Sequence, residues 1–273
     1  MYWKLPRNKV PLESLCYLAI LNLTPDSFSD GGLFFDTDSA LNHVKKLLDQ
    51  GAQIIDIGSE STKPGSHPVE PCEEWARIEP VINDLRKEQP DCLLSIDTRH
   101  PETARLALDV GADIINDVTG FQDPEMLELV SNSKCGVIAM RVRMINDHIY
   151  MPNYSDSSPK DADNAIQELE IVKNRLLNAE IEPERILLDP GFGFGTTFLE
   201  DHALWNALHE IPALLNWPVE RFCIGISRKR FVARSFGVSG NAMLDMKTAE
   251  LHKNAVNIGY RVLRTHSIPS IPR

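Results

Sequence analysis

The sequence has few of the features that mark metal-binding, secreted, membrane or nucleic-acid-binding proteins. Its 273 residues include only five cysteines, scattered and without a CxxC pair, so we expect core thiols in a reducing cytosol rather than zinc ligands or disulfides. No apolar run approaches a membrane span, and the first residues lack the apolar core of a signal peptide. The net charge of −11 argues against nonspecific binding to nucleic acid or to an anionic membrane. We therefore expect a cytoplasmic protein whose partners are small molecules.

Apolar segments alternate with amphipathic ones along most of the chain. Hydrophobic residues make up 42% of the sequence, which is ample for one large core. The apolar segments are continuous rather than alternating, which predicts strands buried on both faces and hence a parallel sheet. We expect strands at 16–22, 53–58, 92–97, 113–118, 135–141, 185–190, 221–226 and 260–265, and helices at 37–50, 72–88, 101–110, 124–132, 161–179, 199–209 and 242–257.

Eight strands with interleaved helices predict an α/β fold, a single-domain (β/α)8 TIM barrel. A doubly wound open sheet is the alternative. We expect the barrel to occupy residues 16–273, preceded by an N-terminal extension at 1–15. Residues 267–273 contain two prolines, so the final covering helix is expected to be missing. The residues before Cys16, or a partner chain, would then cover that face.

Polar and charged side chains collect where the predicted strands end. In a parallel α/β barrel this edge carries the active site. A single Asp is often a helix cap, but carboxylates on most strands of one barrel would be costly to bury without partners. A functional site is therefore the better interpretation. The strand ends carry Asn22, Asp56, Thr62, Asp97, Asn116, Asp189, Lys229, Arg264 and His266.

Two kinds of ligand group are expected at this edge. Asp56, Asp97, Asn116 and Asp189 suit a flat heterocycle with several N–H groups, such as a pterin; a metal cage is the alternative, although tight coordination favours a denser carboxylate set. A second set, Asn22, Thr62, Arg264 and His266, supplies donors for phosphate oxygens. The glycine-rich run at 191–195 resembles a nucleotide loop, but no lysine follows it, so we expect Phe194 to form a pocket wall.

Four sequence blocks resemble the dihydropteroate synthase family: ILNLTPDSFSDGG, DIGSESTKPG, LLDPGFGFG and GISRK. The weaker blocks SIDT and INDVTG lie between them, and the resemblance extends from about residue 18 to residue 268. It implies a Mg²⁺-dependent transferase of folate biosynthesis and a sulfonamide target. Such enzymes condense 6-hydroxymethyl-7,8-dihydropterin pyrophosphate with 4-aminobenzoate, giving 7,8-dihydropteroate and pyrophosphate by a dissociative mechanism.

The resemblance also implies roles for individual residues. Catalysis would fall to Asp97, Lys229, Arg264 and His266, and metal binding to Asn22. The pterin would be held by Asp97, Asn116, Asp189 and Lys229; the pyrophosphate by Asn22, Thr62, Lys63, Arg264 and His266; and the aminobenzoate by Ser27, Phe28, Thr62, Pro64, Phe194 and Arg230.

The chain departs from the family pattern at several positions. Lys63 stands where the family has Arg, and Arg230 where it has a small Ser; Arg230 either pairs with the aminobenzoate carboxylate or points to solvent. Residues 139–143 read AMRVR instead of a Met-His-Met segment. The final helix, usually part of a dimer interface, is absent, yet we expect a homodimer. A pterin-binding methyltransferase domain and a non-catalytic pterin-binding paralogue are the alternative functions.

Overall fold

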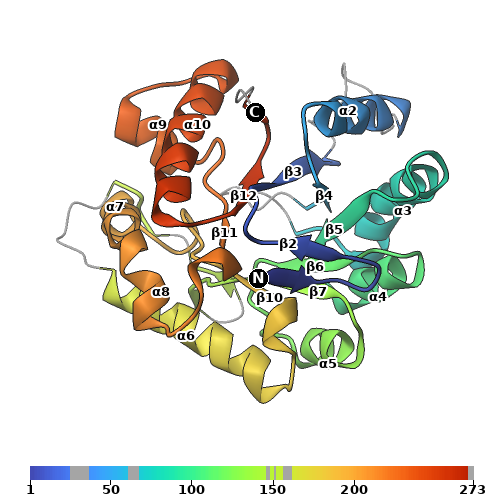
Figure 1. Cartoon of the computed structure of the whole chain (residues 1–273), viewed down its shortest axis with the longest axis horizontal. Helices are drawn as coiled ribbons and strands as arrows, with labels where there is room; N and C mark the ends of the chain where they lie inside the picture. The colour runs from blue at the N-terminus through green and yellow to red at the C-terminus, as the bar shows by residue number, and fades with distance from the viewer. Residues whose placement is uncertain (25–36, 61–67, 146–147, 151, 156–161, 270–273) are drawn as a thin grey trace.

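In a computed structural model of the chain, residues 1–24, 37–60, 68–145, 148–150, 152–155 and 162–269 are described (Figure 1). Eight parallel strands form one sheet in the spatial order β10-β7-β6-β5-β4-β3-β12-β11. A parallel bridge between Leu188 and Phe222 joins the two ends. The sheet is therefore closed, which confirms the (β/α)8 barrel and excludes the open doubly wound sheet.

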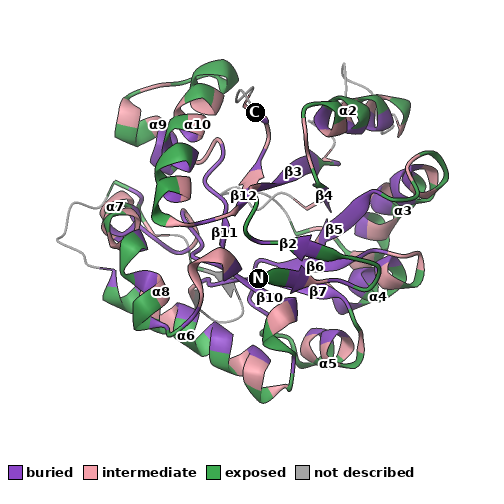
Figure 2. Ribbon diagram, viewed as in Figure 1, coloured by how far each residue is buried: buried purple, intermediate pink, exposed green. Residues whose placement is uncertain are grey.

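The barrel strands follow the predicted ones closely, and they are buried along nearly their whole length (Figure 2). Both faces of each strand are covered, so these strands have continuous apolar sequences. The strands are β3 (Cys16–Asn22), β4 (Ile54–Gly58), β5 (Leu93–Asp97), β6 (Ile114–Asp117), β7 (Gly136–Met140), β10 (Ile186–Asp189), β11 (Cys223–Ile224) and β12 (Val262–Thr265).

Helices surround the strands, and each expected helix is present. Two short helices, α8 (Ile211–Leu214) and α9 (Arg230–Phe236), were not predicted, because four and seven residues are too few for an apolar period to be read. None of the helices in the described part has the length and hydropathy that a bilayer crossing requires. The others are α2 (Thr37–Asp49), α3 (Pro71–Glu88), α4 (Pro101–Asp109), α5 (Pro124–Asn132), α6 (Asp163–Asn178), α7 (Phe198–Asn206) and α10 (Asn241–Ile258).

Residues 1–15 close the N-terminal end of the barrel. They form a hairpin of β1 (Tyr2–Lys4) and β2 (Lys9–Pro11). The Trp3 side chain is fully buried, and its indole N–H donates to the Arg185 carbonyl at 2.8 Å. Four hairpin side chains pack on the inward-pointing residues at that end of the barrel. This cluster contains Trp3, Leu5, Val10, Leu12, Cys16, Leu18, Ile54, Leu93, Ile114, Ile138, Leu187, Cys223 and Val262.

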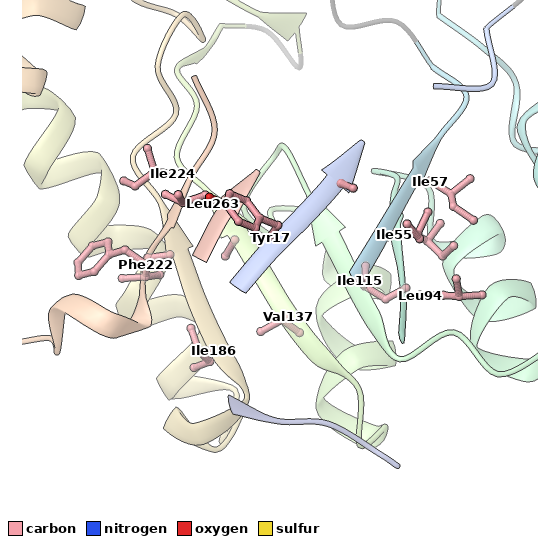
Figure 3. Packing of buried hydrophobic residues seen from close by; sticks show 14 of the residues in the cluster. Tyr17, Ile55, Ile57, Leu94, Ile115, Val137, Ile186, Phe222, Ile224 and Leu263 are labelled. Atoms are coloured by element: carbon pink, nitrogen blue, oxygen red, sulfur yellow. The ribbon is translucent and has the colours of Figure 1, made fainter. Parts of the chain in front are cut away.

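The outer faces of the strands pack against the helices in a second, larger cluster, part of which Figure 3 shows. No helix follows β12 within the described residues, as the prolines predicted. Even so, Tyr17 of β3 and Leu263 of β12 are only 8% and 1% exposed. Ile268 belongs to the same buried cluster. These strand residues are therefore covered although no helix follows β12 in the described part of the chain.

The described part of the segment between β7 and α6 is partly regular. It contains a small antiparallel ribbon of β8 (Met144–Ile145) and β9 (His148–Ile149). Tyr154 then packs edge-on against Phe198 of α7. A two-residue strand carries no readable alternation, so the sequence could not have indicated it.

Candidate active site

The alternation of side chains along each strand determines which polar groups enter the barrel. Residues two apart on a strand share a face. Ile54 belongs to the apolar cluster above the hairpin, so Asp56 also points inward. Leu93 of β5 belongs to the same cluster, so Ser95 and Asp97 also point inward. The interior is therefore apolar at its N-terminal end and polar toward the C-terminal ends of the strands.

Arg264 of β12 lies between two carboxylates in this polar half. Its Nε donates to Asp56 Oδ2 at 2.6 Å, and its Nη2 donates to Asp97 Oδ2 at 2.5 Å. Asn116 Nδ2 also donates to Asp56 Oδ2, at 3.1 Å. One buried cluster thus joins four strands, β12, β4, β5 and β6.

The charge state of Asp97 is finely balanced. Burial raises the pKa of its carboxyl to about 7; the Arg264 guanidinium opposes the rise, and the neighbouring Asp56 carboxylate adds to it. Asp97 is also crowded, because a Cβ at Gly58 would lie 3.2 Å from the Asp97 Cβ. A side chain at Gly58 would therefore press on Asp97, and the Asp97 carboxyl has its pKa raised to about 7.

The opposite side of the interior carries Asp189, at the end of β10. Its Oδ1 accepts the Gly191 N–H at 2.7 Å. A Cβ at Gly225 would lie 2.9 Å from Asp189 Oδ2, so a side chain at Gly225 would displace the Asp189 carboxylate. Burial raises the pKa of Asp189, and the Lys229 ammonium is the largest opposing influence. The Lys229 ammonium is therefore near enough to the Asp189 carboxylate to favour its charged form.

Lys229 contacts the predicted pocket wall. Its Nζ lies 4.5 Å from the centre of the Phe194 ring. Burial lowers the pKa of Lys229 to about 8, and the Asp189 carboxylate opposes that change. An ammonium held against an aromatic face and beside a carboxylate suits a polar, planar ligand.

His266 and Asn22 lie farther toward the strand ends. The His266 ring Nδ1 is 3.0 Å from Ser227 Oγ, and the His266 backbone N–H donates to the same oxygen at 3.1 Å. Asn22, the last residue of β3, is exposed. These two residues therefore stand outside the Arg264 cluster, nearer to solvent.

Arg230 begins α9 and is exposed. Its guanidinium carbon lies 4.2 Å from the centre of the Tyr154 ring, and the Tyr154 hydroxyl donates to buried Asp201 at 2.8 Å. The preceding arginine, Arg228, pairs with Asp245 of α10 at 2.7 Å. Arg230 is thus engaged with an aromatic ring.

Five predicted site residues lie outside the described residues: Ser27, Phe28, Thr62, Lys63 and Pro64. The structure brings together Asp97, Asn116 and Arg264 in one cluster and Asp189, Lys229 and Phe194 in another. Within the described ranges, His, Cys, Asp and Glu side chains form no group of three able to hold a metal ion.

Several residues that shape the site were missed from sequence. Ser227, which holds His266, lies inside the GISRK block and could have been found there. Glu74 of α3 could not, because only the fold brings it to Thr98, whose hydroxyl donates to it at 2.6 Å. Thr98 follows Asp97 and donates its backbone N–H to the Asn116 carbonyl at 3.1 Å. Glu74 therefore supports the strand ends that present Asp97 and Asn116.

Two buried atoms in the interior have no hydrogen-bond partner among the described residues, Asp56 Oδ1 and Ser95 Oγ. These residues are register neighbours on β4 and β5. An unpaired buried carboxylate oxygen is costly unless a donor reaches it. The interior is therefore suited to a ligand, or to water, that donates hydrogen bonds.

Comparison with known proteins gives concordant results. The sequence profile described as "Pterin binding enzyme" matches residues 18–266. The dihydropteroate synthase of Streptococcus pyogenes serotype M6 is 37% identical over 256 residues, covering 92% of this chain and 90% of that protein.

Solved structures agree in fold as well as in sequence. Xanthomonas albilineans dihydropteroate synthase with 4-aminobenzoic acid matches with a TM-score of 0.82 at 31% identity, covering 98% of this chain and 93% of the other. Burkholderia cenocepacia dihydropteroate synthase complexed with 7,8-dihydropteroate matches with a TM-score of 0.81 at 30% identity, covering 98% and 91%.

Proposed function

The chain belongs to the pterin-binding enzyme family, and from that membership we propose how its residues form 7,8-dihydropteroate. The enzyme is a transferase of folate biosynthesis. It joins 6-hydroxymethyl-7,8-dihydropterin pyrophosphate to 4-aminobenzoate and releases pyrophosphate. The observation that carries this function is the buried arrangement of Asp56, Asp97, Asn116 and Arg264 facing Asp189 and Lys229, together with sequence identity over nearly the whole chain.

We assign the pterin ring to this interior. Asp97 and Asp189 accept hydrogen bonds from ring N–H and amine groups, and Asn116 offers both a donor and an acceptor. Lys229 donates to ring acceptors, with Phe194 as the pocket wall. The unpaired Asp56 oxygen supports the assignment, because a pterin supplies the donors that it lacks.

The pyrophosphate is assigned to the outer part of the site. His266 and Asn22 face that region, and Thr62 and Lys63 would join them from outside the described residues. Arg264 has two tasks in this proposal. It holds Asp56 and Asp97 in place, and it keeps a positive charge beside the departing pyrophosphate.

The aminobenzoate is assigned to the side of the site that Phe194 borders, and Ser27, Phe28, Thr62 and Pro64, which lie outside the described residues, would join in binding it. The Arg230 guanidinium lies over the ring of Tyr154. A contact between Arg230 and the aminobenzoate carboxylate stays a prediction, and it requires the stack on Tyr154 to be given up or shared.

The residues fit a magnesium ion only in combination with the substrate. Mg²⁺ binds hard oxygen ligands, keeps several waters and is commonly held by one or two protein groups plus substrate phosphates. The exposed amide oxygen of Asn22 meets that requirement. The ion would supply electrostatic stabilisation of the leaving pyrophosphate.

In the reaction, the bond between the pterin methylene carbon and the pyrophosphate oxygen breaks, and a bond forms from that carbon to the aminobenzoate nitrogen, which loses a proton. Asp97 lies where its carboxylate favours the positive charge that develops on the pterin. Arg264 and His266 favour the negative charge that develops on pyrophosphate. An aryl amine is a weak nucleophile, so these electrostatic contributions carry most of the rate.

Product analysis tests the function. Incubation with both substrates is expected to give dihydropteroate, identified by mass. Transfer of a methyl group from a methylated pterin to a corrinoid, with no dihydropteroate, would support the methyltransferase alternative. Pterin binding with neither product would support the non-catalytic one.

The affinity for pterin is expected to fall as the pH is lowered through about 7. Burial raises the pKa of Asp97 to about 7, so below that pH the carboxyl is protonated: it loses its negative charge, and one of its oxygens donates instead of accepting. Linkage limits the loss to about tenfold per pH unit. Titration calorimetry from pH 5.5 to 7.5 measures the effect. In Asp97→Asn the affinity should be lower and flat over this range; a flat wild-type profile would contradict the assignment.

We propose a cytoplasmic homodimer that uses α10. This helix exposes Met243, Met246 and Ile258, which are 43%, 52% and 39% accessible. Beside it, a cavity of about 390 Å³ opens between α7, α9 and α10, lined by Phe198 and Trp205 among others. Light scattering at micromolar concentration should give twice the chain mass of 30.7 kDa, and a monomer would contradict the proposal.

A further inference from the structure

Arg141, which follows β7, is among the largest fully buried side chains of the protein. It occupies the segment where the sequence departs from the family pattern. Its Nε donates to the Pro190 carbonyl at 2.8 Å, and its Nη2 donates to the Gly191 carbonyl at 2.9 Å. Its Nη1 donates to Glu168 of α6 at 2.8 Å. Arg141 thus points into the backbone of the loop after β10.

The Gly191 peptide connects this arginine to the pterin pocket. The Gly191 carbonyl accepts from Arg141 and from the Phe194 N–H, the latter at 3.2 Å. The Gly191 N–H donates to the Asp189 carboxylate at 2.7 Å. The backbone N–H of Arg141 also donates to the Asp189 carbonyl at 3.1 Å. One side chain therefore constrains both Asp189 and Phe194.

The loop and the Arg141 backbone are in close contact. Gly191 has φ of +71°, and a Cβ there would lie 2.3 Å from the Arg141 carbonyl oxygen. The Arg141 carbonyl lies so close to Gly191 that no side chain fits at this position. We infer that contacts from other residues stabilise the loop conformation. The planar guanidinium is suited to this, because its donors diverge in fixed directions and reach two consecutive carbonyls together.

We propose that Arg141 is a positioning residue for the pterin pocket: through the Pro190 and Gly191 carbonyls it fixes the loop that orients the Asp189 carboxylate and the Phe194 ring. This inference rests on the proposed pterin site. The Glu168 carboxylate balances the buried positive charge of Arg141. Its second oxygen accepts a hydrogen bond from Arg143 at 2.9 Å. Arg141 touches no reacting group in this assignment, so its effect passes entirely through Asp189 and Phe194.

Arg143 provides a matched control. It shares Glu168 with Arg141 and also pairs with Glu200 at 3.4 Å, but none of its hydrogen bonds reaches the Pro190 or Gly191 carbonyl. Arg143→Met therefore removes a neighbouring arginine from the same ion-pair network and leaves the two loop carbonyls bonded.

The experiment compares Arg141→Met, Arg141→Lys and Arg143→Met with the wild type in two measurements. Calorimetry with 6-hydroxymethylpterin gives the pterin affinity, and hydrogen–deuterium exchange gives the protection of amides 189–195; thermal unfolding is recorded alongside. We expect Arg141→Met to weaken pterin binding about tenfold and to speed exchange over 189–195. Arg141→Lys should restore part of the affinity, since it keeps the charge and one carbonyl contact. Arg143→Met should bind pterin within twofold of wild type.

Two results would overturn the inference. One is hydrogen–deuterium exchange over residues 189–195 that is unchanged from wild type in both Arg141→Lys and Arg141→Met. This result would overturn the inference whether or not the protein binds pterin. The other is equal weakening of pterin binding by Arg143→Met. If Arg141→Met does not fold, Arg141→Lys alone decides, and native affinity with native exchange in that variant would overturn it. Failure of the wild type to bind pterin, with exchange altered as expected, would count instead against the proposed function.

Discussion

Arg264→Met is expected to lower kcat by about 10²- to 10³-fold, the usual cost of removing a group that stabilises developing negative charge. The substitution removes the cation between the fully buried Asp56 carboxylate and the largely buried Asp97 carboxylate. Breaking a buried ion pair on one side costs about 3–5 kcal/mol, so the free energy of unfolding should fall as well. Steady-state kinetics and urea unfolding measure the two effects.

The important comparison for Arg264 is between turnover and binding. Its role at the pyrophosphate requires kcat to fall at least tenfold more than the affinity for a pterin that lacks phosphates. Arg261, at the entrance to the same strand, bonds to the Val256 and Tyr260 carbonyls, so Arg261→Met is the control and should keep turnover. Equal losses of turnover and pterin affinity in Arg264→Met would identify Arg264 as purely structural.

Asp189→Asn is expected to weaken pterin binding about 30- to 150-fold. The carboxylate accepts from the Gly191 N–H at 2.7 Å and lies near the Lys229 ammonium. The NH2 group of an Asn side chain would face one of these donors, or a donor of the ligand, without an acceptor between them. Hydrogen bonds to charged groups contribute about 1.5–3 kcal/mol, and the upper part of that range gives the stated loss. Titration calorimetry with a pterin measures it.

Asp113→Asn controls for the general cost of altering a buried carboxylate. Asp113 lies at the opposite end of the barrel, bound to Arg7, Arg86 and the Leu94 N–H. Its substitution should destabilise the fold and leave pterin affinity unchanged. Native pterin affinity in a folded Asp189→Asn protein would remove Asp189 from the pterin site.

The positions of the strands and main helices could be predicted from sequence because a closed parallel barrel imposes a simple pattern. Strands buried on both faces read as continuous apolar runs, and helices between them keep a 3.6-residue period. The hairpin at residues 1–15 could not be recognised in this way. Its two strands have three residues each, and Trp3 is buried only because the open end of the barrel lies beneath it.

The sequence indicated which residues belong to the site, but it did not indicate which of them contact one another. Polar residues at strand ends indicated Asp97, Asn116 and Arg264 from chemistry alone. Their contacts depend on ring closure, which brings Arg264 to residues 208 and 167 positions away in sequence, Asp56 and Asp97. The sequence therefore assigned Arg264 to phosphate, with no indication of its ion pairs. The role of Arg141 was hidden for the same reason, because both of its carbonyl partners lie about fifty residues along the chain.

Pyrophosphate release tests the central claim most directly. The enzyme is incubated with 6-hydroxymethyl-7,8-dihydropterin pyrophosphate and Mg²⁺, with and without 4-aminobenzoate, and both pyrophosphate and dihydropteroate are measured. We expect sustained release only when both substrates are present, with one dihydropteroate formed per pyrophosphate and a loss of both in Arg264→Met. Release at the same rate without 4-aminobenzoate, or no dihydropteroate from a folded wild-type protein, would contradict the central claim.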